Sequence, residues 1–398
     1  MLNKVRGGAL AICLGAAVVL GFGCLIRTPG ALAQSRDQQW SRCENQDRAN
    51  AFDLIITACT NIIQSGGGNL AVAFVDRGNA FLLGPLHDYS RAIADYTRAT
   101  ALNPQFAEAF YDRGEAYRMQ RDYGRAITDF TEAIRLNPRY GDAFYQRGNS
   151  YLEGPKADYR RAIADYNQAV ALNPLDAHAF NNRGTAYQSG PQPDYAQAIA
   201  DYTQAIALNP QYAEAFNNRG LARAQRQPPE YAAAVADYTE AIAINPRLAD
   251  AFYNRGNAYR LASNHDYDRA IADYDHAAAL EPANANYQTG RCLGRAIANR
   301  DLVVALAACD AGLRLSPNDD RLLDCRGLVE LRQQDWQAAW NDYNAATQAN
   351  AALAVHLYGR GIAALRLGRG PEGRMDLAGA SQLDPNIAQI YAGYGIRP

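Results

Sequence analysis

A unit of 34 to 36 residues recurs along this chain from about residue 71 onward, and this repeat constrains the fold more than any other feature. Most units close on a proline, and an Arg-Gly pair follows about ten residues later. The closing pairs are Asn103-Pro104, Asn137-Pro138, Asn173-Pro174, Asn209-Pro210, Asn245-Pro246, Glu281-Pro282, Ser316-Pro317 and Asp384-Pro385. A fixed period of this length predicts stacked helical hairpins, each of which buries its apolar face against its neighbours.

Residues 141–176 illustrate one unit. A first helix carries Gly148 on its apolar face, the pair Gly154-Pro155 interrupts it, and a second helix with apolar residues at helical spacing follows. The unit ends at Asn173-Pro174, because proline lacks a backbone N–H and biases the residue before it away from the helical conformation. Small residues such as Gly148 predict a close approach of two antiparallel helices.

This pattern resembles the tetratricopeptide repeat, in which an aromatic residue, Gly and Tyr on the first helix precede Ala, an aromatic residue, Ala and Pro on the second. These positions are held by Gly114, Tyr117, Ala126, Phe130, Ala133 and Pro138, and by Gly184, Tyr187, Ala198, Tyr202, Ala205 and Pro210. The resemblance implies an all-α, right-handed superhelical solenoid of antiparallel helix pairs. The shared property of the family is the binding of peptides and proteins.

We divide the mature chain by this resemblance. Residues 36–70 form a degenerate first hairpin, residues 71–284 six clear repeats, and residues 285–387 three weaker ones. Residues 388–398 are predicted to begin a C-terminal solvating helix.

An arginine stands where such repeats usually carry Leu before the glycine, and an aspartate recurs in the second helix. The arginines are Arg77, Arg113, Arg147, Arg183, Arg219, Arg255, Arg291, Arg326 and Arg360. The aspartates are Asp95, Asp129, Asp165, Asp201, Asp237, Asp273, Asp342 and Asp376. Their joint recurrence predicts a bidentate ion pair that links helices within or between repeats and fixes their register. A row of ligand-binding charges is the alternative.

Two units carry the same pair of cysteine substitutions. Cys43 and Cys292 replace the first-helix glycine, while Cys59 and Cys309 replace the second-helix aromatic residue. We predict the disulfides Cys43–Cys59 and Cys292–Cys309, which would be consistent with an oxidising compartment. Buried free thiols are the alternative, and the role of Cys325 stays open. The sequence contains no pair of cysteines or histidines with the spacing of metal ligands, so we expect no metal site.

In the architecture that the resemblance implies, the first helices line a concave groove. Asn182, Asn218 and Asn254 take equivalent places in three consecutive repeats and predict an amide ladder that contacts an extended partner chain. Further groove residues are predicted to be Asn149, Asn257, Tyr111, Tyr145 and Tyr253. Solvation of the helices is the alternative role for the asparagines.

Acidic residues stand at the lip of the predicted groove, where some relatives carry basic residues that bind a terminal carboxylate. They are Glu108, Asp142, Glu214 and Asp250. We therefore expect a neutral or basic ligand, with binding strongest at low salt.

The first 33 residues are typical of a secretory signal. Lys4 and Arg6 precede an apolar stretch, and Ala31-Leu32-Ala33 offers a cleavage site before Gln34. An uncleaved membrane anchor and a lipoprotein attached at Cys24 are alternatives. Removal of this segment takes three basic residues and no acidic one, so the formal charge changes from −2 to −5.

The rest of the sequence argues against catalysis and nucleic-acid binding. The five histidines fall at unrelated repeat positions, no phosphate-binding or nucleophile motif occurs, and basic tracts are absent. We therefore expect no enzyme activity and no cofactor. The preferred hypothesis is a periplasmic or secreted scaffold that binds a protein or an extended peptide of unknown identity. A membrane-attached accessory factor for envelope assembly or polysaccharide export is one alternative, and glycan binding through groove tyrosines is another.

Overall fold

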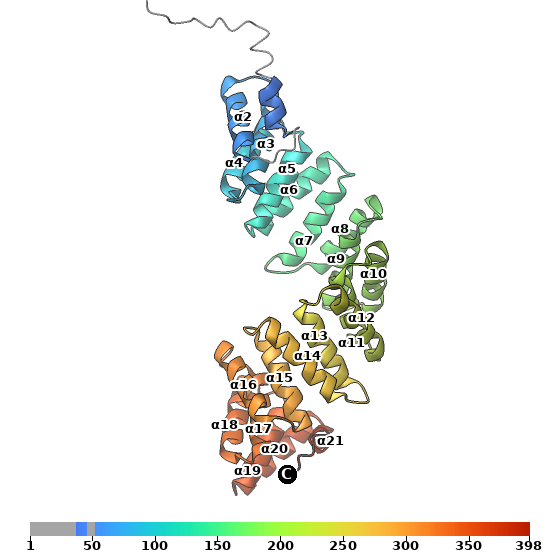
Figure 1. Cartoon of the computed structure of the whole chain (residues 1–398), viewed down its shortest axis with the longest axis vertical. Helices are drawn as coiled ribbons and strands as arrows, with labels where there is room; N and C mark the ends of the chain where they lie inside the picture. The colour runs from blue at the N-terminus through green and yellow to red at the C-terminus, as the bar shows by residue number, and fades with distance from the viewer. Residues whose placement is uncertain (1–36, 46–51) are drawn as a thin grey trace, which may run out of the picture. The chain divides into compact units, whose positions relative to one another are not determined.

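A computed structural model describes residues 37–45 and 52–398, which divide into two compact units, Met1–Ala116 and Tyr117–Pro398. We call them the N-terminal and the C-terminal unit and consider each by itself. All regular secondary structure in the described residues is helical, and consecutive helices pair along the chain (Figure 1). This confirms the predicted all-α solenoid of antiparallel helix pairs. The predicted signal segment, residues 1–33, lies outside the described residues.

The N-terminal unit begins with a helical segment at residues 37–43 and continues with α2 (Phe52–Ser65), α3 (Leu70–Leu83), α4 (Tyr89–Leu102) and most of α5 (Ala107–Met119). The C-terminal unit contains α6 (Tyr123–Leu136), α7 (Gly141–Glu153), α8 (Tyr159–Leu172), α9 (Ala177–Ser189), α10 (Tyr195–Leu208), α11 (Ala213–Gln225), α12 (Tyr231–Ile244), α13 (Ala249–Leu261), α14 (Tyr267–Leu280), α15 (Ala285–Ala298), α16 (Leu302–Leu315), α17 (Asp320–Gln333), α18 (Trp336–Ala349), α19 (Ala354–Arg366), α20 (Gly370–Leu383) and α21 (Ile387–Gly393).

The repeated sequence sets both ends of most second helices. An aspartate caps the first turn, as in α10, where the Asp194 carboxylate accepts the backbone N–H of Gln197 at 3.0 Å. At the other end Asn209 adopts an extended backbone conformation immediately before Pro210. The chain then turns into the first helix of the next repeat.

Each regular hairpin is packed around one glycine and one aromatic ring. A Cβ atom added to Gly184 would lie 2.9 Å from Cε1 of Tyr202, whose side chain is fully buried in the hairpin of α9 and α10. The same contact joins Gly148 to Tyr166 and Gly256 to Tyr274. Only glycine allows the ring this close to the first helix, because any side chain would overlap it.

The predicted arginine–aspartate pair is present in the regular hairpins of both units. In α9 and α10, Arg183 donates from Nε and Nη2 to the two carboxylate oxygens of Asp201, at 2.8 and 2.6 Å. Its Nη1 donates to Asn167 Oδ1 of the preceding second helix, at 2.8 Å. Equivalent bidentate pairs are Arg77–Asp95, Arg147–Asp165, Arg255–Asp273, Arg326–Asp342 and Arg360–Asp376. The arginine therefore links helices both within one repeat and between successive repeats, which fixes their register.

The C-terminal helix α21 packs against the last repeat. Ile387 and Tyr391 are buried, and the Tyr391 hydroxyl donates to the backbone oxygen of Val355 at 3.0 Å. Arg332 donates to the backbone oxygen of Tyr394 just beyond the helix. Within the described residues no helix is long and apolar enough to cross a membrane.

Candidate binding groove and cysteine pairs

First helices of consecutive repeats contact each other in the C-terminal unit. The sequence of contacts runs from α7 to α9, α11, α13, α15, α17 and α19, whereas successive second helices in this unit make no such contacts. In a curved stack, the helices that contact their equivalents in the neighbouring repeats lie on the inner side, because the repeats are closest together there. The inner faces of α7, α9, α11 and α13 are the candidate groove.

The three predicted ladder asparagines form hydrogen bonds from one repeat to the previous one. Asn218 donates from Nδ2 to Asn181 Oδ1 at 3.1 Å, and Asn254 donates to Asn217 Oδ1 at 3.0 Å. Asn182 donates to both Tyr145 Oη and Asn149 Oδ1, each at 3.0 Å. The amides thus join the first helices to one another.

Two of the three amides keep a carbonyl oxygen available after these bonds. Asn218 and Asn254 are partly exposed, and in the C-terminal unit as described no hydrogen bond reaches Oδ1 of either residue. Asn182 differs, because its Oδ1 accepts from Asn181 Nδ2 at 3.2 Å. Two carbonyl oxygens in consecutive repeats are therefore free to accept hydrogen bonds from a ligand.

The structure places Asn149 and Asn257 against core tyrosines. The Tyr166 hydroxyl donates to Asn149 Oδ1 at 2.6 Å, and the Tyr274 hydroxyl donates to Asn257 Oδ1 at 2.9 Å. Asn149 is buried, and its Nδ2 donates a hydrogen bond to Gln146 Oε1. Both residues thus help to satisfy a buried phenol, a role that the sequence reasoning missed. The recurrence of Asn one residue after glycine, together with Tyr in the second helix, was the available signal.

The predicted groove tyrosines have different surroundings. Tyr145 accepts the hydrogen bond from Asn182 and is half-buried. The ring of Tyr253 lies 5.9 Å from that of Tyr274 and 5.4 Å from that of Tyr287, between centroids. Tyr111 is half-buried on α5 of the N-terminal unit. Tyr145 and Tyr253 border the amide row at its two ends in sequence.

Several first helices carry acidic side chains near their first turns. Asp142 and Glu214 are exposed, while Asp250 accepts the Tyr287 hydroxyl at 2.6 Å. Burial and this hydrogen bond raise the pKa of Tyr287. In the N-terminal unit, burial and the nearby carboxylates raise the pKa of Asp76 and of Asp112 to about 7.

The two predicted cysteine pairs lie within reach of a disulfide bond. The Cα atoms of Cys43 and Cys59 are 4.9 Å apart, and those of Cys292 and Cys309 are 5.5 Å apart, both within the usual range. All four residues are buried. Cys325 is buried and free, and burial raises the pKa of its thiol. A thiol of this kind is a poor nucleophile and packs as a small apolar group.

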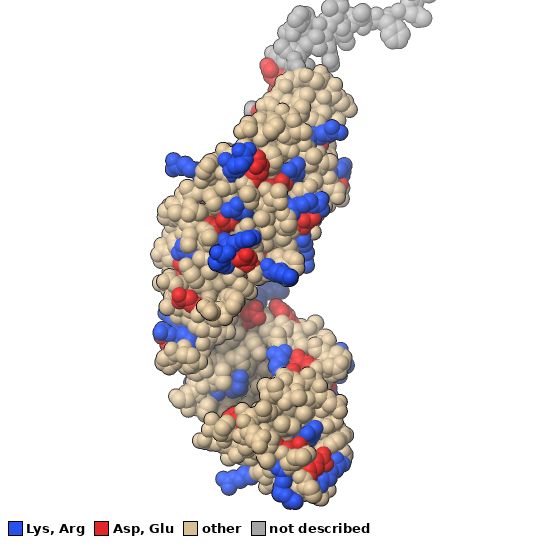
Figure 2. Space-filling model, turned by 180° about the vertical axis from the view of Figure 1, so that it is seen from behind, with Lys and Arg blue, Asp and Glu red and all other residues tan. Residues whose placement is uncertain are grey.

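Charged side chains of both signs are mixed on one face of the protein. On the face shown in Figure 2, acidic and basic residues lie among each other rather than in a large patch of one sign. Short-range pairs such as Asp122–Arg125 and Glu132–Arg135 account for part of this mixture.

The paired helices and the contacts between successive first helices define an α-solenoid repeat protein. Family models of the tetratricopeptide repeat match residues 86–140, 111–158 and 156–190, and those of the TPR repeat match residues 192–227 and 230–262. The chain is a tetratricopeptide-repeat protein, as the sequence predicted. Repeats of this family indicate a scaffold for protein–protein interaction.

Solved structures share this fold at low sequence identity. The protein c5321, a protective antigen of uropathogenic Escherichia coli with an SLR fold, is 15% identical, with 92% of this chain and 81% of that chain covered and a TM-score of 0.61. A tetratricopeptide repeat protein from Parabacteroides merdae is 18% identical over 66% of this chain and 99% of its own, with a TM-score of 0.51. Part of a repeat protein from Cytophaga hutchinsonii is 19% identical over 64% and 98%, with a TM-score of 0.50. Comparison with curated proteins finds no match.

Proposed function

We propose that this protein is an exported scaffold whose candidate groove holds an extended segment of another protein. The observation that carries the proposal is the amide row of α9, α11 and α13. Its members are fixed in position by hydrogen bonds between repeats, and Asn218 and Asn254 each keep a carbonyl oxygen for a ligand. Pre-oriented acceptors of this kind suit the backbone N–H groups of an extended chain, because they need no reordering on binding.

The surroundings of the amide row favour a neutral or basic segment. Asp142 and Glu214 are exposed near the first turns of α7 and α11. Tyr145 and Tyr253 add aromatic surface on which apolar parts of a ligand can pack. The proposed contact is thus mainly hydrogen bonding to the backbone of the partner, with electrostatic attraction at the lip.

The cysteine pairs support an extracytoplasmic location. Two pairs at bonding distance at equivalent repeat positions are what an oxidising compartment would maintain as disulfides. Together with the signal-like residues 1–33, they support a periplasmic or secreted protein with a mature chain that starts at Gln34. Intact mass measurement of the processed protein tests both points. We expect a chain from Gln34 with one free thiol after denaturation, and three or more free thiols would contradict the two disulfides.

The groove is tested by two matched double variants of the mature protein. Asn218→Ala with Asn254→Ala removes the exposed amides together with two hydrogen bonds between repeats. Asn181→Ala with Asn217→Ala removes the same two bonds from their buried acceptors, as well as the bond from Asn181 to Asn182, and leaves the exposed amides in place. Any loss of stability caused by the two bonds between repeats is therefore common to both variants.

The readout is the set of proteins that each variant retains from an envelope extract, at low and at high salt. We expect a partner that binds the wild-type protein and the Asn181/Asn217 variant but is lost from the Asn218/Asn254 variant. Equal retention by both variants would place the binding surface elsewhere.

A further inference from the structure

Four hairpins of this protein hold one of their own arginines in the same small clamp. In α13 and α14 the backbone oxygen of Tyr259 accepts the N–H of Asp266 at 3.0 Å, which fixes the ring and the carboxylate relative to each other. Asp266 accepts from the backbone N–H of Arg269 at 3.1 Å and from its Nε at 2.6 Å. The guanidinium carbon of Arg269 lies 4.8 Å from the centroid of the Tyr259 ring. The cation is thus bound by a carboxylate and by an aromatic face.

The same backbone hydrogen bonds from the aspartate to the ring residue and from the arginine to the aspartate recur in three other hairpins. The clamp members there are Phe81, Asp88 and Arg91 in the N-terminal unit, and Tyr117, Asp122 and Arg125 as well as Tyr151, Asp158 and Arg161 in the C-terminal unit. The distances from guanidinium carbon to ring centroid are 4.3, 4.4 and 5.6 Å. The ring and the acid therefore form a reproducible guanidinium site, and the chain itself shows its ligand.

The hairpin of α9 and α10 has the ring and the acid of this clamp but lacks the arginine. Asp194 donates its N–H to the backbone oxygen of Tyr187 at 2.9 Å, and its Oδ1 accepts from the N–H of residue 197 at 3.0 Å, as in the other hairpins. Residue 197 is glutamine. Among the described residues no cation lies over the Tyr187 ring, and no side chain donates to the Asp194 carboxylate.

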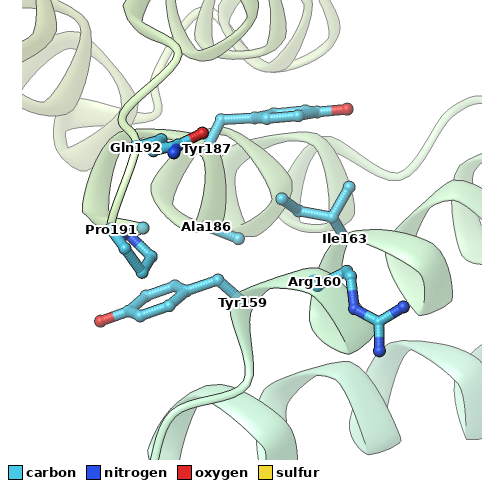
Figure 3. A pocket seen from close by; sticks show the side chains of 8 residues that line it. Tyr159, Arg160, Ile163, Ala186, Tyr187, Pro191 and Gln192 are labelled. Carbon is cyan, nitrogen blue, oxygen red and sulfur yellow. The ribbon is translucent and has the colours of Figure 1, made fainter.

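A cavity of about 350 Å³ opens beside Tyr187. Its walls include Tyr159, Ile163 and Pro191, with the ring of Tyr187 on the opposite side from Tyr159 (Figure 3). Arg160 also borders it, and its guanidinium points away from Tyr187. These apolar walls can cover the methylene groups of a long side chain.

An equivalent cavity lies two repeats later, and there the arginine of the clamp is present. It measures about 460 Å³ and is lined by Tyr231, Val235 and Tyr259, the counterparts of Tyr159, Ile163 and Tyr187. Arg269 itself forms part of its lining. The guanidinium site of this hairpin therefore borders the cavity, so that the corresponding site beside Tyr187 is open to a side chain from outside.

We propose that Tyr187, Asp194 and the adjoining cavity bind an arginine side chain of a partner protein. The Asp194 carboxylate accepts from the guanidinium, the Tyr187 ring stacks on it, and Tyr159 and Ile163 contact its aliphatic part. This site lies at the turn between α9 and α10 and involves none of the amide-row residues, so it does not depend on the proposed groove. A single arginine binds weakly, on the order of millimolar, and contributes to a larger interface.

The probe for this proposal is arginine with a blocked amino and carboxyl group, titrated into the mature protein and followed by ligand-detected NMR. Gln197→Arg supplies the missing arginine and restores the arrangement of the other four hairpins, so the variant is expected to fold. We expect at least a tenfold loss of binding in this variant. Gln204→Arg adds the same charge at another exposed position of α10 and is the matched control, which should bind as the wild type does.

The reverse variant, Arg269→Gln, empties the clamp of α13 and α14 and should add a second site, which would raise the bound signal about twofold. The blocked lysine amide should bind several-fold more weakly than the arginine probe, because its ammonium group stacks less well and cannot donate in a planar fork. Equal binding by the Gln197→Arg and Gln204→Arg proteins, or no gain in Arg269→Gln, would overturn the proposal. Equal binding of lysine would overturn its specificity for guanidinium.

Discussion

The hairpin of α9 and α10 and the hairpin of α15 and α16 connect their two helices in different ways at the same repeat positions. In the first, Gly184 receives the buried ring of Tyr202, and Arg183 pairs with Asp201. In the second, Cys292 and Cys309 take the places of the glycine and the ring, and Ala308 takes the place of the aspartate. Both hairpins retain antiparallel packing.

The arginine shows how the second hairpin adapts to the loss of the aspartate. Arg291 donates instead to Asp275 of the preceding second helix at 2.8 Å, and Arg295 donates to the same carboxylate. The pair within the hairpin is thus absent, while the link to the previous repeat remains. The comparison teaches that the glycine–ring contact and the arginine–aspartate pair are lost together in this hairpin, where a cysteine pair at disulfide distance takes the contact point.

The largest expected effect comes from removal of the ring in the regular hairpin. Tyr202→Ala should lower the free energy of unfolding by about 4 kcal/mol, because it leaves a large cavity against Gly184. Tyr202→Phe keeps the ring and loses only the hydrogen bonds to Thr185 and Gln188, so it should cost about 1 kcal/mol. Urea unfolding measures both, and similar values for the two variants would show that packing is not the main contribution.

The cysteine pair of the second hairpin should contribute nearly as much to the free energy of unfolding. Cys292→Ser with Cys309→Ser is expected to lower the free energy of unfolding by about 3 kcal/mol in the chain-entropy model, because the bond closes a loop of 17 residues. A reductant should destabilise the wild-type protein by at least this amount, because it also reduces the Cys43–Cys59 pair. Cys325→Ser is the control, and an unfolding curve of the wild type that does not respond to reductant would contradict the prediction.

Arg183 and Arg291 should differ in their contribution to the free energy of unfolding. Arg183→Gln leaves the nearly buried carboxylate of Asp201 without a cation and should cost about 2 kcal/mol. Arg291→Gln should cost less than about 1 kcal/mol, because Asp275 is more exposed and keeps Arg295. The second change Asp201→Asn should recover part of the loss in Arg183→Gln. If both arginine variants lost the same stability, burial of the aspartate partner would not determine how much the ion pair stabilises the protein.

A pH-dependent effect concerns a buried carboxylate on α17. Asn181 and Asn217 of the regular repeats have Asp324 as their counterpart, and burial, together with Asp320, raises the pKa of Asp324 to about 7. Its Oδ1 atom is buried without a hydrogen-bond partner. Because the folded-state pKa lies above the unfolded value of about 4, the folded state binds more protons between these values. Stability contributed by the protonated form is therefore full below about pH 4 and is lost as the pH rises through about 7.

Asp324→Asn replaces this group with the amide found in the regular repeats. The variant should be more stable than the wild type at pH 8 by up to about 4 kcal/mol, with the difference shrinking toward pH 4. Thermal unfolding across this pH range measures the difference. A difference in stability between the variant and the wild type that does not change with pH would indicate an effect of packing, not of titration of Asp324.

Much of the fold could be predicted from the sequence because the repeat places the same residues at the same helical positions many times. The arginine–aspartate pair and the two cysteine pairs were found by comparing equivalent positions such as 183, 201, 292 and 309. The roles of the groove residues were harder to predict. Asn149 and Asn257 look equivalent to solvated asparagines in sequence, yet each accepts a hydrogen bond from a buried tyrosine hydroxyl. Periodicity identifies the face of a helix, but it does not reveal which polar group a buried phenol requires.

The sequence by itself determined the helical hairpins, their boundaries at Asp caps and Asn-Pro turns, and the positions where two helices meet. These features follow from local backbone preferences and from side-chain volume, both of which repeat with the unit. Only the tertiary structure decided how the polar groups are distributed between repeats. It showed that Asn218 and Asn254 donate to the preceding repeat and that Tyr187 and Asp194 form a clamp without its arginine. The physical reason for the amide bonds is that their partners, 37 residues apart in the sequence, are brought together by the stacking of whole helices, which no local preference encodes.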